Sequence, residues 1–387
     1  MSSPVLITGA FGQVGKRCTE ILLSRGRTVI ATDLRNEVVV AAAEALARAT
    51  HPGVLQTVYA DLLDAAAIND LVAEHKPSAI IHLAGMLSPP SYRNPRLARR
   101  VNVDGTTNVV QAAKALSVPP LLVFASSAAV YGSVNPYRYP ERITAQTPLN
   151  PIDQYGEDKV LAEAVIAGSG LPYALLRLGG VVAPDGAANL NSDYLLLMRA
   201  TPGDNRLHTV DARDVALAFA NAVDRAATIN GKALVIAGNE THVHIHRDVE
   251  DDMFDAVGIG RLGPKASLPG DPEDDRGWAF TGWFDTTESQ ALLDYQRHDW
   301  AQTIAWVAES QGQLLRRVLP VLGPVLRPVM RTALAAQRRV DKRGRYADPW
   351  TLIANKYGPQ VLAGRSEAPS HQIELPTMDP ARPRRTR

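Results

Sequence analysis

The chain has 387 residues, 45% of them apolar, enough for one large domain or two with a sizeable core. Its 41 Lys and Arg residues balance 40 Asp and Glu residues, so nothing in the overall charge favours a nucleic-acid partner. The single cysteine, Cys18, excludes an internal disulfide, and without a leader or a long apolar run we expect a soluble, cytoplasmic protein.

Short apolar runs alternate with helical patterns over the first 180 residues. The apolar runs predict strands at Val5–Thr8, Thr28–Thr32, Val54–Tyr59, Ala79–Leu83, Leu121–Ala125 and Tyr173–Arg177. The helical patterns predict helices at about Val14–Arg25, Val38–Ala49, Ala65–Glu74, Ala98–Leu116 and Gln154–Ala167. Strands that are apolar throughout and separated by helices indicate an α/β fold, a Rossmann-type doubly wound parallel sheet, with residues 1–180 as one domain.

The pattern loosens after residue 179. We expect a loop to about residue 205, and then elements at about 205–240 that return to the first domain. The predicted elements are helices at Ala212–Arg225, Val249–Val257, Ser289–Asp294 and Ala301–Ser310 and a strand at Ala233–Ala237. Residues 181–306 are therefore assigned mainly to a small substrate lobe.

Residues 307–387 form a basic, apolar tail. Between Gln311 and Arg345 there are nine basic residues and one acid, and three prolines recur every four residues, at Pro320, Pro324 and Pro328. The prolines argue against one long helix, and the Pro/Arg-rich end predicts disorder. Two hypotheses stay open for this tail: peripheral contact with an anionic membrane, or packing on its own domain or a second subunit.

Three glycines follow the first strand in Thr8-Gly9-Ala10-Phe11-Gly12-Gln13-Val14-Gly15. Gly9 permits a tight turn, Gly12 lets a pyrophosphate approach the backbone, and Gly15 lets helix and strand pack closely. A glycine-rich turn between a strand and a helix N-terminus is typical of dinucleotide binding. The predicted cofactor contacts in this turn are Gly9, Phe11, Gly12, Gln13, Val14 and Gly15.

An acid at the end of the second strand, Asp33, favours NAD as the cofactor. Its carboxylate can accept hydrogen bonds from the ribose hydroxyls and would repel the 2′-phosphate of NADP. Arg35 would favour NADP instead if it folded inward. Asp61 and Leu62, after the third strand, are placed for the adenine, although Asp61 also fits a helix N-cap.

Further motifs resemble the extended short-chain dehydrogenase/reductase family, of the NAD-dependent epimerase/dehydratase type. The resemblance covers residues 4 to 306 and rests on TGAFGQVG, His82-Leu83-Ala84-Gly85, Asn102-Val103-Asp104-Gly105-Thr106, Ser126-Ser127-Ala128-Ala129-Val130-Tyr131-Gly132, Tyr155-Gly156-Glu157-Asp158-Lys159, Val210-Asp211-Ala212-Arg213-Asp214-Val215-Ala216 and Leu293-Asp294-Tyr295-Gln296. It implies cofactor contacts at Leu83, Ala84, Gly85, Asn102, Ser126, Tyr155 and Lys159, with Asn102 either in a proton relay or shaping its helix. It also implies a homodimer through the helices at Ala98–Leu116 and Gln154–Ala167.

The residues themselves support an acid/base pair. Tyr155 and Lys159 are four apart and share a helix face. A nearby ammonium and a positive nicotinamide ring favour the phenolate of Tyr155, which then serves as acid/base. Ser127 would bond the substrate oxygen and hold it against Tyr155, so the three predicted catalytic residues are Ser127, Tyr155 and Lys159.

The substrate side is less defined. The loop that follows the fourth strand suggests Met86 and Ser88, and the later loop suggests Asn189, Asn191 and Tyr194, for which turn formation is the simpler explanation. Where nucleotide-sugar enzymes usually carry an Arg-Tyr-Phe-Asn-like stretch, this chain has Arg177-Leu178-Gly179-Gly180. The segment that follows, residues 181–208, is also short. This departure weighs against a nucleotide sugar and leaves the small-molecule substrate open.

Three alternate histidines, His242, His244 and His246, would line one face of a strand. Three imidazoles could bind zinc, but no fourth ligand is evident and the predicted chemistry needs no metal, so we predict no metal site.

The sequence therefore favours an NAD-dependent oxidoreductase that transfers hydride between NAD(H) and a secondary alcohol or ketone. The alternative enzyme is a sugar epimerase or dehydratase, in which NAD is oxidant and then reductant within one cycle. A third hypothesis is a binding module that senses NAD(H), against which the full set of Ser127, Tyr155 and Lys159 argues.

Overall fold

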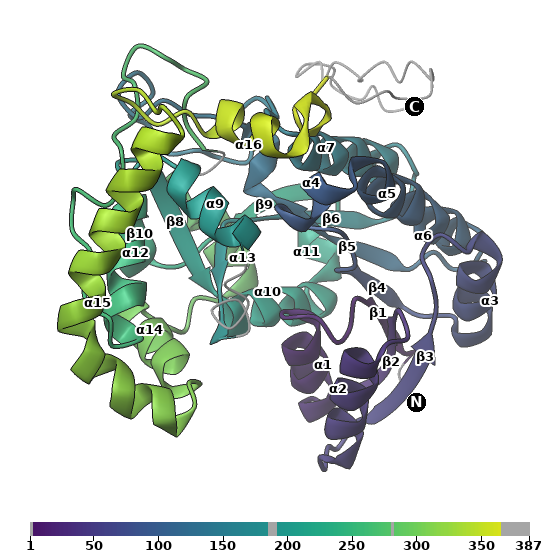
Figure 1. Ribbon diagram of the computed structural model, residues 1–387. Helices are drawn as coiled ribbons and strands as arrows, with labels where there is room; N and C mark the ends of the chain where they lie inside the picture. Colours follow the sequence, from purple (N-terminus) through teal and green to yellow (C-terminus); the bar gives the residue numbers. More distant parts are fainter. Residues whose placement is uncertain (1–2, 185–191, 280–281, 365–387) are drawn as a thin grey trace.

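The computed structural model describes residues 3–184, 192–279 and 282–364, and its centre is a seven-stranded parallel sheet (Figure 1). The strand order is β3-β2-β1-β4-β5-β6-β9, and every pairing is parallel. The strands are β1 (Val5–Thr8), β2 (Thr28–Asp33), β3 (Val54–Tyr59), β4 (Ala79–His82), β5 (Leu121–Ser127), β6 (Tyr173–Leu178) and β9 (Lys232–Ile236). The predicted fold class, a Rossmann-type doubly wound sheet, is confirmed.

Helices cover both faces of this sheet because successive strand residues point to opposite sides. Val5 and Ile7 of β1 join one core and Leu6 joins the other. The first core contains side chains of α1 (Gly15–Ser24), α2 (Glu37–Arg48) and α10 (Ala212–Asp224). The second contains side chains of α3 (Ala65–His75), α6 (Gly105–Lys114) and α7 (Gln154–Ala167). The helix α6 follows α4 (Pro90–Arg93), α5 (Pro95–Arg99) and a π-helical turn, η1 (Arg100–Asp104).

A second, three-stranded sheet lies beyond the carboxyl ends of these strands, in the order β10-β8-β7 (Figure 1). It is built from β7 (Gly180–Val182), β8 (Arg206–Asp211) and β10 (Val243–Ile245). The predicted loop to residue 205 is therefore wrong in part, because it contains β7 and the helix α9 (Ser192–Ala200). Asn189 and Asn191 lie outside the described residues. The remaining elements are α11 (Ala226–Ile229), η3 (Glu240–His242), α12 (His246–Ala256), α13 (Thr287–Leu293) and α14 (Trp300–Glu309).

The tail contains one long helix, α15 (Gln313–Val340), despite its three prolines. Because the prolines are four residues apart, they lie close to one side of the helix, and all three are exposed. Each proline removes one backbone hydrogen bond, but α15 packs along residues 258–266, where a Cβ on Gly258 would lie 2.8 Å from the Pro320 ring, and this packing explains why the expected break does not occur. The segment Arg317–Val340 is long and apolar enough to cross a membrane by length and composition, a test that core helices also pass.

The chain then turns back over the catalytic half of the molecule. The short helix α16 (Pro349–Tyr357) and the turn η4 (Pro359–Val361) pack against α9 and α7. Trp350, Ile353 and Val361 share a buried cluster with Tyr92 of α4 and Ile152 before α7. Residues 347–364 thus belong to the folded structure, whereas the division into domains at residues 180 and 306 stays a prediction.

Candidate active site

The glycine turn joins β1 to α1. Gly9 has φ +67°, in the left-handed region that favours glycine, and a Cβ there would lie 2.8 Å from the Ala84 nitrogen. A Cβ at Gly15 would lie 2.0 Å from the Gly9 carbonyl oxygen, so the helix could not pack this closely on the turn. A Cβ at Gly12 would meet only that same oxygen, at 3.4 Å. The Gly12 backbone is therefore open to a ligand, which fits a dinucleotide pyrophosphate at the N-terminus of α1.

Asp33 closes this turn at the end of β2. One carboxylate oxygen accepts a hydrogen bond from the Phe11 N–H at 3.3 Å, and the other accepts one from the Leu34 N–H at 2.9 Å. Burial raises the pKa of Asp33 above its usual value, and the two N–H donors oppose that shift. Arg35 does not fold inward, because its guanidinium lies 5.3 Å from the centre of the Tyr59 ring. The Asp33 carboxylate is therefore not paired with the Arg35 guanidinium and can accept hydrogen bonds from a ribose.

We predict that Asp33→Asn will shift the preference of the chain toward NADP. The amide keeps an oxygen for the N–H donors but removes the charge that repels a 2′-phosphate, so the ratio of the NADPH and NADH dissociation constants should fall about tenfold. Fluorescence titration with both nucleotides measures this ratio. Asp64→Asn is the matched control, because Asp64 caps α3 and asparagine caps a helix equally well. An unchanged ratio in Asp33→Asn would remove Asp33 from the cofactor site.

Tyr155 and Lys159 lie on the first turns of α7, and both are buried. The Lys159 ammonium donates a hydrogen bond to the Ala125 carbonyl at 2.8 Å and lies 5.9 Å from the centre of the Tyr155 ring. Burial lowers the pKa of Lys159 to about 8. Burial raises the pKa of Tyr155 above its usual value, and a hydrogen bond with Ser127 works in the opposite direction. The three predicted catalytic residues are therefore brought together at the carboxyl end of β5.

The two adjacent serines have different surroundings. Ser127 is half-buried, and its hydroxyl accepts a hydrogen bond from the Ala129 N–H at 3.2 Å at the start of η2 (Ala128–Tyr131). The Ser126 hydroxyl is buried and donates to the Glu163 carboxylate. A cofactor contact at Ser126 would therefore have to use its backbone, because its side chain is committed to the core.

Asn102 shapes the loop after β4. Its amide group accepts a hydrogen bond from the Met86 N–H at 2.8 Å and donates one to the Met86 carbonyl at 3.0 Å. A Cβ on Gly85 would lie 3.0 Å from the Asn102 side chain and 3.6 Å from the Lys159 nitrogen, so this loop passes directly over the catalytic lysine. Asn102 belongs to the π-helical turn η1, a distortion found frequently at functional sites.

The remaining predicted contacts lie around this centre. The Asp61 carboxylate, which is exposed, accepts a hydrogen bond from the Leu63 N–H at 2.9 Å, and the N-cap of α3 is Asp64, so the N-cap alternative for Asp61 is wrong. Leu62 is buried, and its carbonyl accepts a hydrogen bond from Asn108 at 2.8 Å. Leu83, Ala84, Met86 and Ser88 are half-buried along the loop after β4, while Tyr194 belongs to α9.

Sequence analysis missed a buried pair beside Tyr155. Asp153 caps α7 by accepting a hydrogen bond from the Gly156 N–H at 2.9 Å, and it accepts another from the Tyr92 hydroxyl at 2.6 Å. Burial raises the pKa of Asp153 to about 6. An acid before a helix is a recognisable N-cap, but no local pattern links it to Tyr92, which lies 61 positions earlier.

The three histidines do not gather at one point. His242 ends η3 and contacts Thr209, His244 lies in β10 against Trp300, and His246 begins α12 and contacts Glu250. The predicted strand face is wrong, since β10 has only three residues. Within the described parts of the chain, no group of three His, Cys, Asp or Glu side chains is placed to hold a metal ion.

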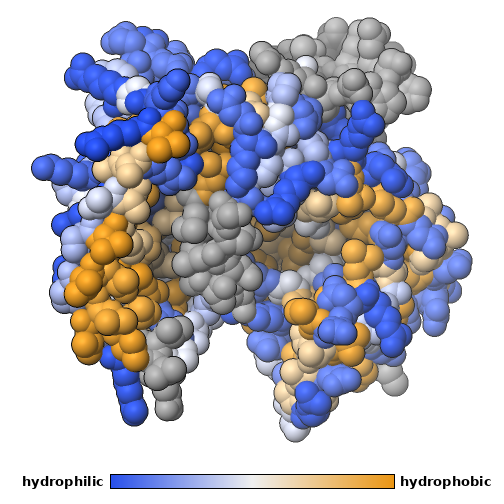
Figure 2. Space-filling model, viewed as in Figure 1, coloured by the Kyte–Doolittle hydropathy of each residue, from blue (hydrophilic) through white to orange (hydrophobic). Residues whose placement is uncertain are grey.

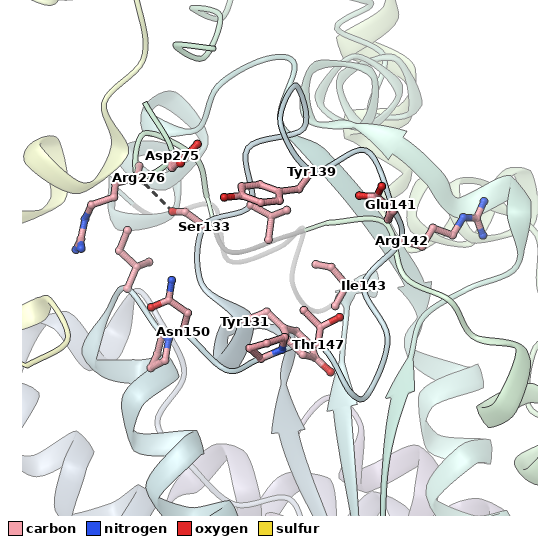
Figure 3. Close-up of a pocket in the computed structure, with 14 residues that line it drawn as sticks. Tyr131, Ser133, Tyr139, Glu141, Arg142, Ile143, Thr147, Asn150, Asp275 and Arg276 are labelled. Atoms are coloured by element: carbon pink, nitrogen blue, oxygen red, sulfur yellow. Dashed lines mark hydrogen bonds between the residues drawn. The ribbon is translucent and has the colours of Figure 1, made fainter. Parts of the chain in front are cut away.

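A pocket of about 510 Å³ lies beside the segment that connects η2 to α7 (Figure 3). Polar side chains lie around it: the hydroxyl groups of Tyr131, Ser133, Tyr139 and Thr147, the amide of Asn150, the carboxylates of Glu141 and Asp275, and Arg276. Arg142 also lines it, but its guanidinium points away and donates to Glu240. Tyr155 and Lys159 do not line it. The pocket therefore adjoins the catalytic residues without containing them.

A parallel Rossmann sheet with a glycine turn, an acid after β2 and a buried Tyr–Lys pair defines a dinucleotide-binding protein. The model of the NAD dependent epimerase/dehydratase family matches residues 5–237, and the chain belongs to this family. The predicted family, the NAD dependence and the enzyme class are thereby confirmed. The match favours the epimerase/dehydratase alternative over the broader prediction of net hydride transfer to an alcohol or ketone.

Several curated relatives of this chain are named as epimerases. A UDP-glucose 4-epimerase of Lactobacillus helveticus is 30% identical over 195 residues, which are 49% of this chain and 55% of that protein. One of Mycolicibacterium smegmatis is 33% identical over 162 residues, 42% of this chain and 49% of that protein. The chain thus spans about half the length of the curated relatives it matches.

Solved structures share the fold. The UDP-Glc/GlcNAc 4-epimerase of Campylobacter jejuni has a TM-score of 0.65 at 20% identity and covers 79% of this chain and 98% of its own. The UDP-glucose 4-epimerase of Brucella ovis, solved in complex with NAD, has a TM-score of 0.60 at 21% identity, covering 81% of this chain and 99% of its own. At these identities the likeness concerns the fold alone.

Proposed function

We propose that the chain is an NAD-dependent epimerase or dehydratase that acts on a hydroxyl-bearing carbon of a nucleotide-linked sugar. The observation that carries this proposal is the meeting of Ser127, Tyr155 and Lys159 at the carboxyl end of β5, in a chain of the epimerase/dehydratase family. The names of the relatives, UDP-glucose 4-epimerases, suggest the substrate class.

The Ser127 hydroxyl would hold the substrate oxygen against Tyr155. The Tyr155 phenolate would remove the proton from that oxygen and later return it, and the Lys159 ammonium would stabilise the phenolate. Bound NAD supplies the hydride acceptor and, once reduced, the hydride donor of the cycle. The glycine turn and Asp33 would bind its pyrophosphate and ribose, and Lys159 would bind the nicotinamide ribose.

The pocket beside residues 131–152 supports a hydroxyl-rich substrate. Beside apolar residues, its lining offers hydroxyl, amide, guanidinium and carboxylate groups, which can donate and accept the hydrogen bonds that a sugar requires. A second candidate, net oxidation of a secondary alcohol, is favoured by Gly180, which presents no side chain where nucleotide-sugar enzymes of the family usually carry an asparagine. The two candidates differ in whether free NADH accumulates.

The test measures the cofactor and the product together. Purified protein is denatured without added nucleotide, and the released dinucleotide is identified. The native protein is then incubated with UDP-glucose, UDP-N-acetylglucosamine and UDP-glucuronic acid, and the products are followed by NMR and by absorbance of NADH. We expect retained NAD and a new sugar nucleotide without net NADH. An empty site together with stoichiometric NADH release from simple alcohols would replace this proposal by the second candidate.

Two partner predictions also stay proposals. The homodimer would form through α6 and α7, as implied by the family resemblance, and analytical ultracentrifugation measures it. Contact with a membrane would involve α15.

A further inference from the structure

The helix α15 is attached to the protein along one side. A Cβ on Gly323 would lie 2.7 Å from the Gly258 carbonyl oxygen, so the two backbones touch. The Arg331 guanidinium donates a hydrogen bond to the Leu262 carbonyl at 2.6 Å, and Arg338 donates one to the Lys265 carbonyl at 3.0 Å. These contacts fix α15 along the loop of residues 258–266 and determine which side faces outward.

The outward side is an aliphatic stripe. Apart from the adjacent Val321 and Leu322, its members are three or four residues apart, so they lie on one face of the helix, and all are exposed. They are Val318, Val321, Leu322, Val325, Val329, Thr332, Ala336 and Val340. Val321 is 75% exposed, Val325 64% and Val329 59%, and the stripe runs for about 33 Å at the rise of an α-helix. Figure 2 shows the hydrophobic patch over the first half of α15, at the left of the view. An exposed apolar stripe of this length is typical of an interaction site.

The charges beside the stripe are of one sign. No acid occurs between Gln313 and Val340, whereas arginines occur at both ends of the helix, at 316–317 and 338–339, and in its middle at 327 and 331. Arg331 and Arg338 donate to backbone carbonyl groups, which carry no charge that would neutralise the guanidiniums. Arg317, Arg339 and Lys342 are exposed. The surface is therefore both apolar and cationic.

We propose that this stripe docks the protein on an anionic membrane, with α15 lying in the plane of the interface. An apolar face with exposed cations at its two ends, Arg317 at one and Arg339 and Lys342 at the other, suits a surface of acidic phospholipids, where each Arg or Lys strengthens binding about fivefold. A symmetric contact with a second copy would place two such arginine-rich helices side by side, with no acid in either to compensate. If α15 crossed the membrane instead, the contacts of Gly323, Arg331 and Arg338 with the loop would be broken. The guanidinium groups of Arg331 and Arg338 would then be buried in hydrocarbon.

The proposal is independent of the catalytic one and is tested by vesicle flotation of the full chain. The vesicles are phosphatidylcholine alone or with about 30 mol% phosphatidylglycerol, at low and high salt. We expect binding to the anionic vesicles only, weakened by salt. The double variant Val321→Glu/Val325→Glu should reduce the bound fraction at least about tenfold, because it places two carboxylates at the lipid boundary.

Matched controls separate docking from folding and from self-association. Val38→Glu/Val118→Glu replaces two equally exposed valines, 80% and 78%, on other parts of the surface and should float like the native chain. Native melting temperatures in both variants show that the fold is intact. Equal flotation of Val321→Glu/Val325→Glu and the native chain overturns the proposal. A dimer in solution that this variant alone abolishes overturns it as well, and assigns the stripe to a second copy.

Discussion

Tyr155→Phe should lower kcat by about two to four orders of magnitude while leaving NAD binding and thermal stability almost unchanged. The phenol is buried on α7, hydrogen-bonds with Ser127 and lies 5.9 Å, measured from its ring centre, from the Lys159 ammonium. Because burial raises the pKa of Tyr155 and the Asp153 and Asp158 carboxylates raise it further, its phenolate needs a positive charge nearby, which the Lys159 ammonium is placed to supply. Phenylalanine keeps the ring and removes the only group that accepts the proton.

The measurement is the rate with the sugar nucleotide identified in the substrate screen, together with the amount of bound NAD. Tyr173→Phe is the control, because Tyr173 begins β6, at the amino ends of the strands and away from Ser127 at the carboxyl end of β5, and should retain full activity. Ser127→Ala should cause a smaller loss, since it removes the group that orients the substrate and leaves the acid/base in place. A Tyr155→Phe variant with more than about a tenth of native activity would exclude Tyr155 as the acid/base.

The sequence predicted the structure best where the signal is a pattern between residues that are close in the chain. Strands β1 to β6 were predicted from short apolar runs, which are typical of strands covered by helices, and their observed ends differ by two residues at most. Tyr155 and Lys159 could be paired because a spacing of four puts them on one helix face. The strand β8 was missed because Arg206 and His208 interrupt its apolar residues.

The errors arose where tertiary contacts decide the outcome. Prolines at positions 320, 324 and 328 predicted a broken helix, but packing of α15 on residues 258–266 outweighs the lost hydrogen bonds. The Tyr92–Asp153 pair could not be found from spacing, since its members come from different helices. Likewise, the sequence could not show that the Ser126 hydroxyl points to Glu163 while Ser127 points to the catalytic tyrosine.

The second large effect concerns stability and the buried ion pair between Glu163 and Arg177. The carboxylate lies one turn after Lys159 on α7, and Arg177 of β6 donates to it twice, at 2.7 Å and 2.9 Å, with both side chains buried. Arg177 also donates to the Tyr131 hydroxyl at 3.0 Å and to the Ala145 carbonyl at 2.8 Å. Burial alone would lower the pKa of Arg177, but Glu163 raises it above its usual value. The pair thus joins β6, α7 and the segment after β5.

Arg177→Met should lower the free energy of unfolding at pH 7 by about 3–5 kcal/mol, because it leaves the Glu163 carboxylate buried without its partner. Urea unfolding measures this loss.

The double variant Arg177→Met/Glu163→Gln decides what the pair does. If the cost of the single variant comes from an unpaired buried charge, neutralising Glu163 should recover at least about half of the lost stability. If the double variant is as unstable as Arg177→Met, the loss comes from packing and from the Tyr131 and Ala145 contacts instead. The activity of the double variant adds a separate result. Recovered stability with a low kcat would show that the ion pair also positions α7, and with it Tyr155 and Lys159, against the end of β5.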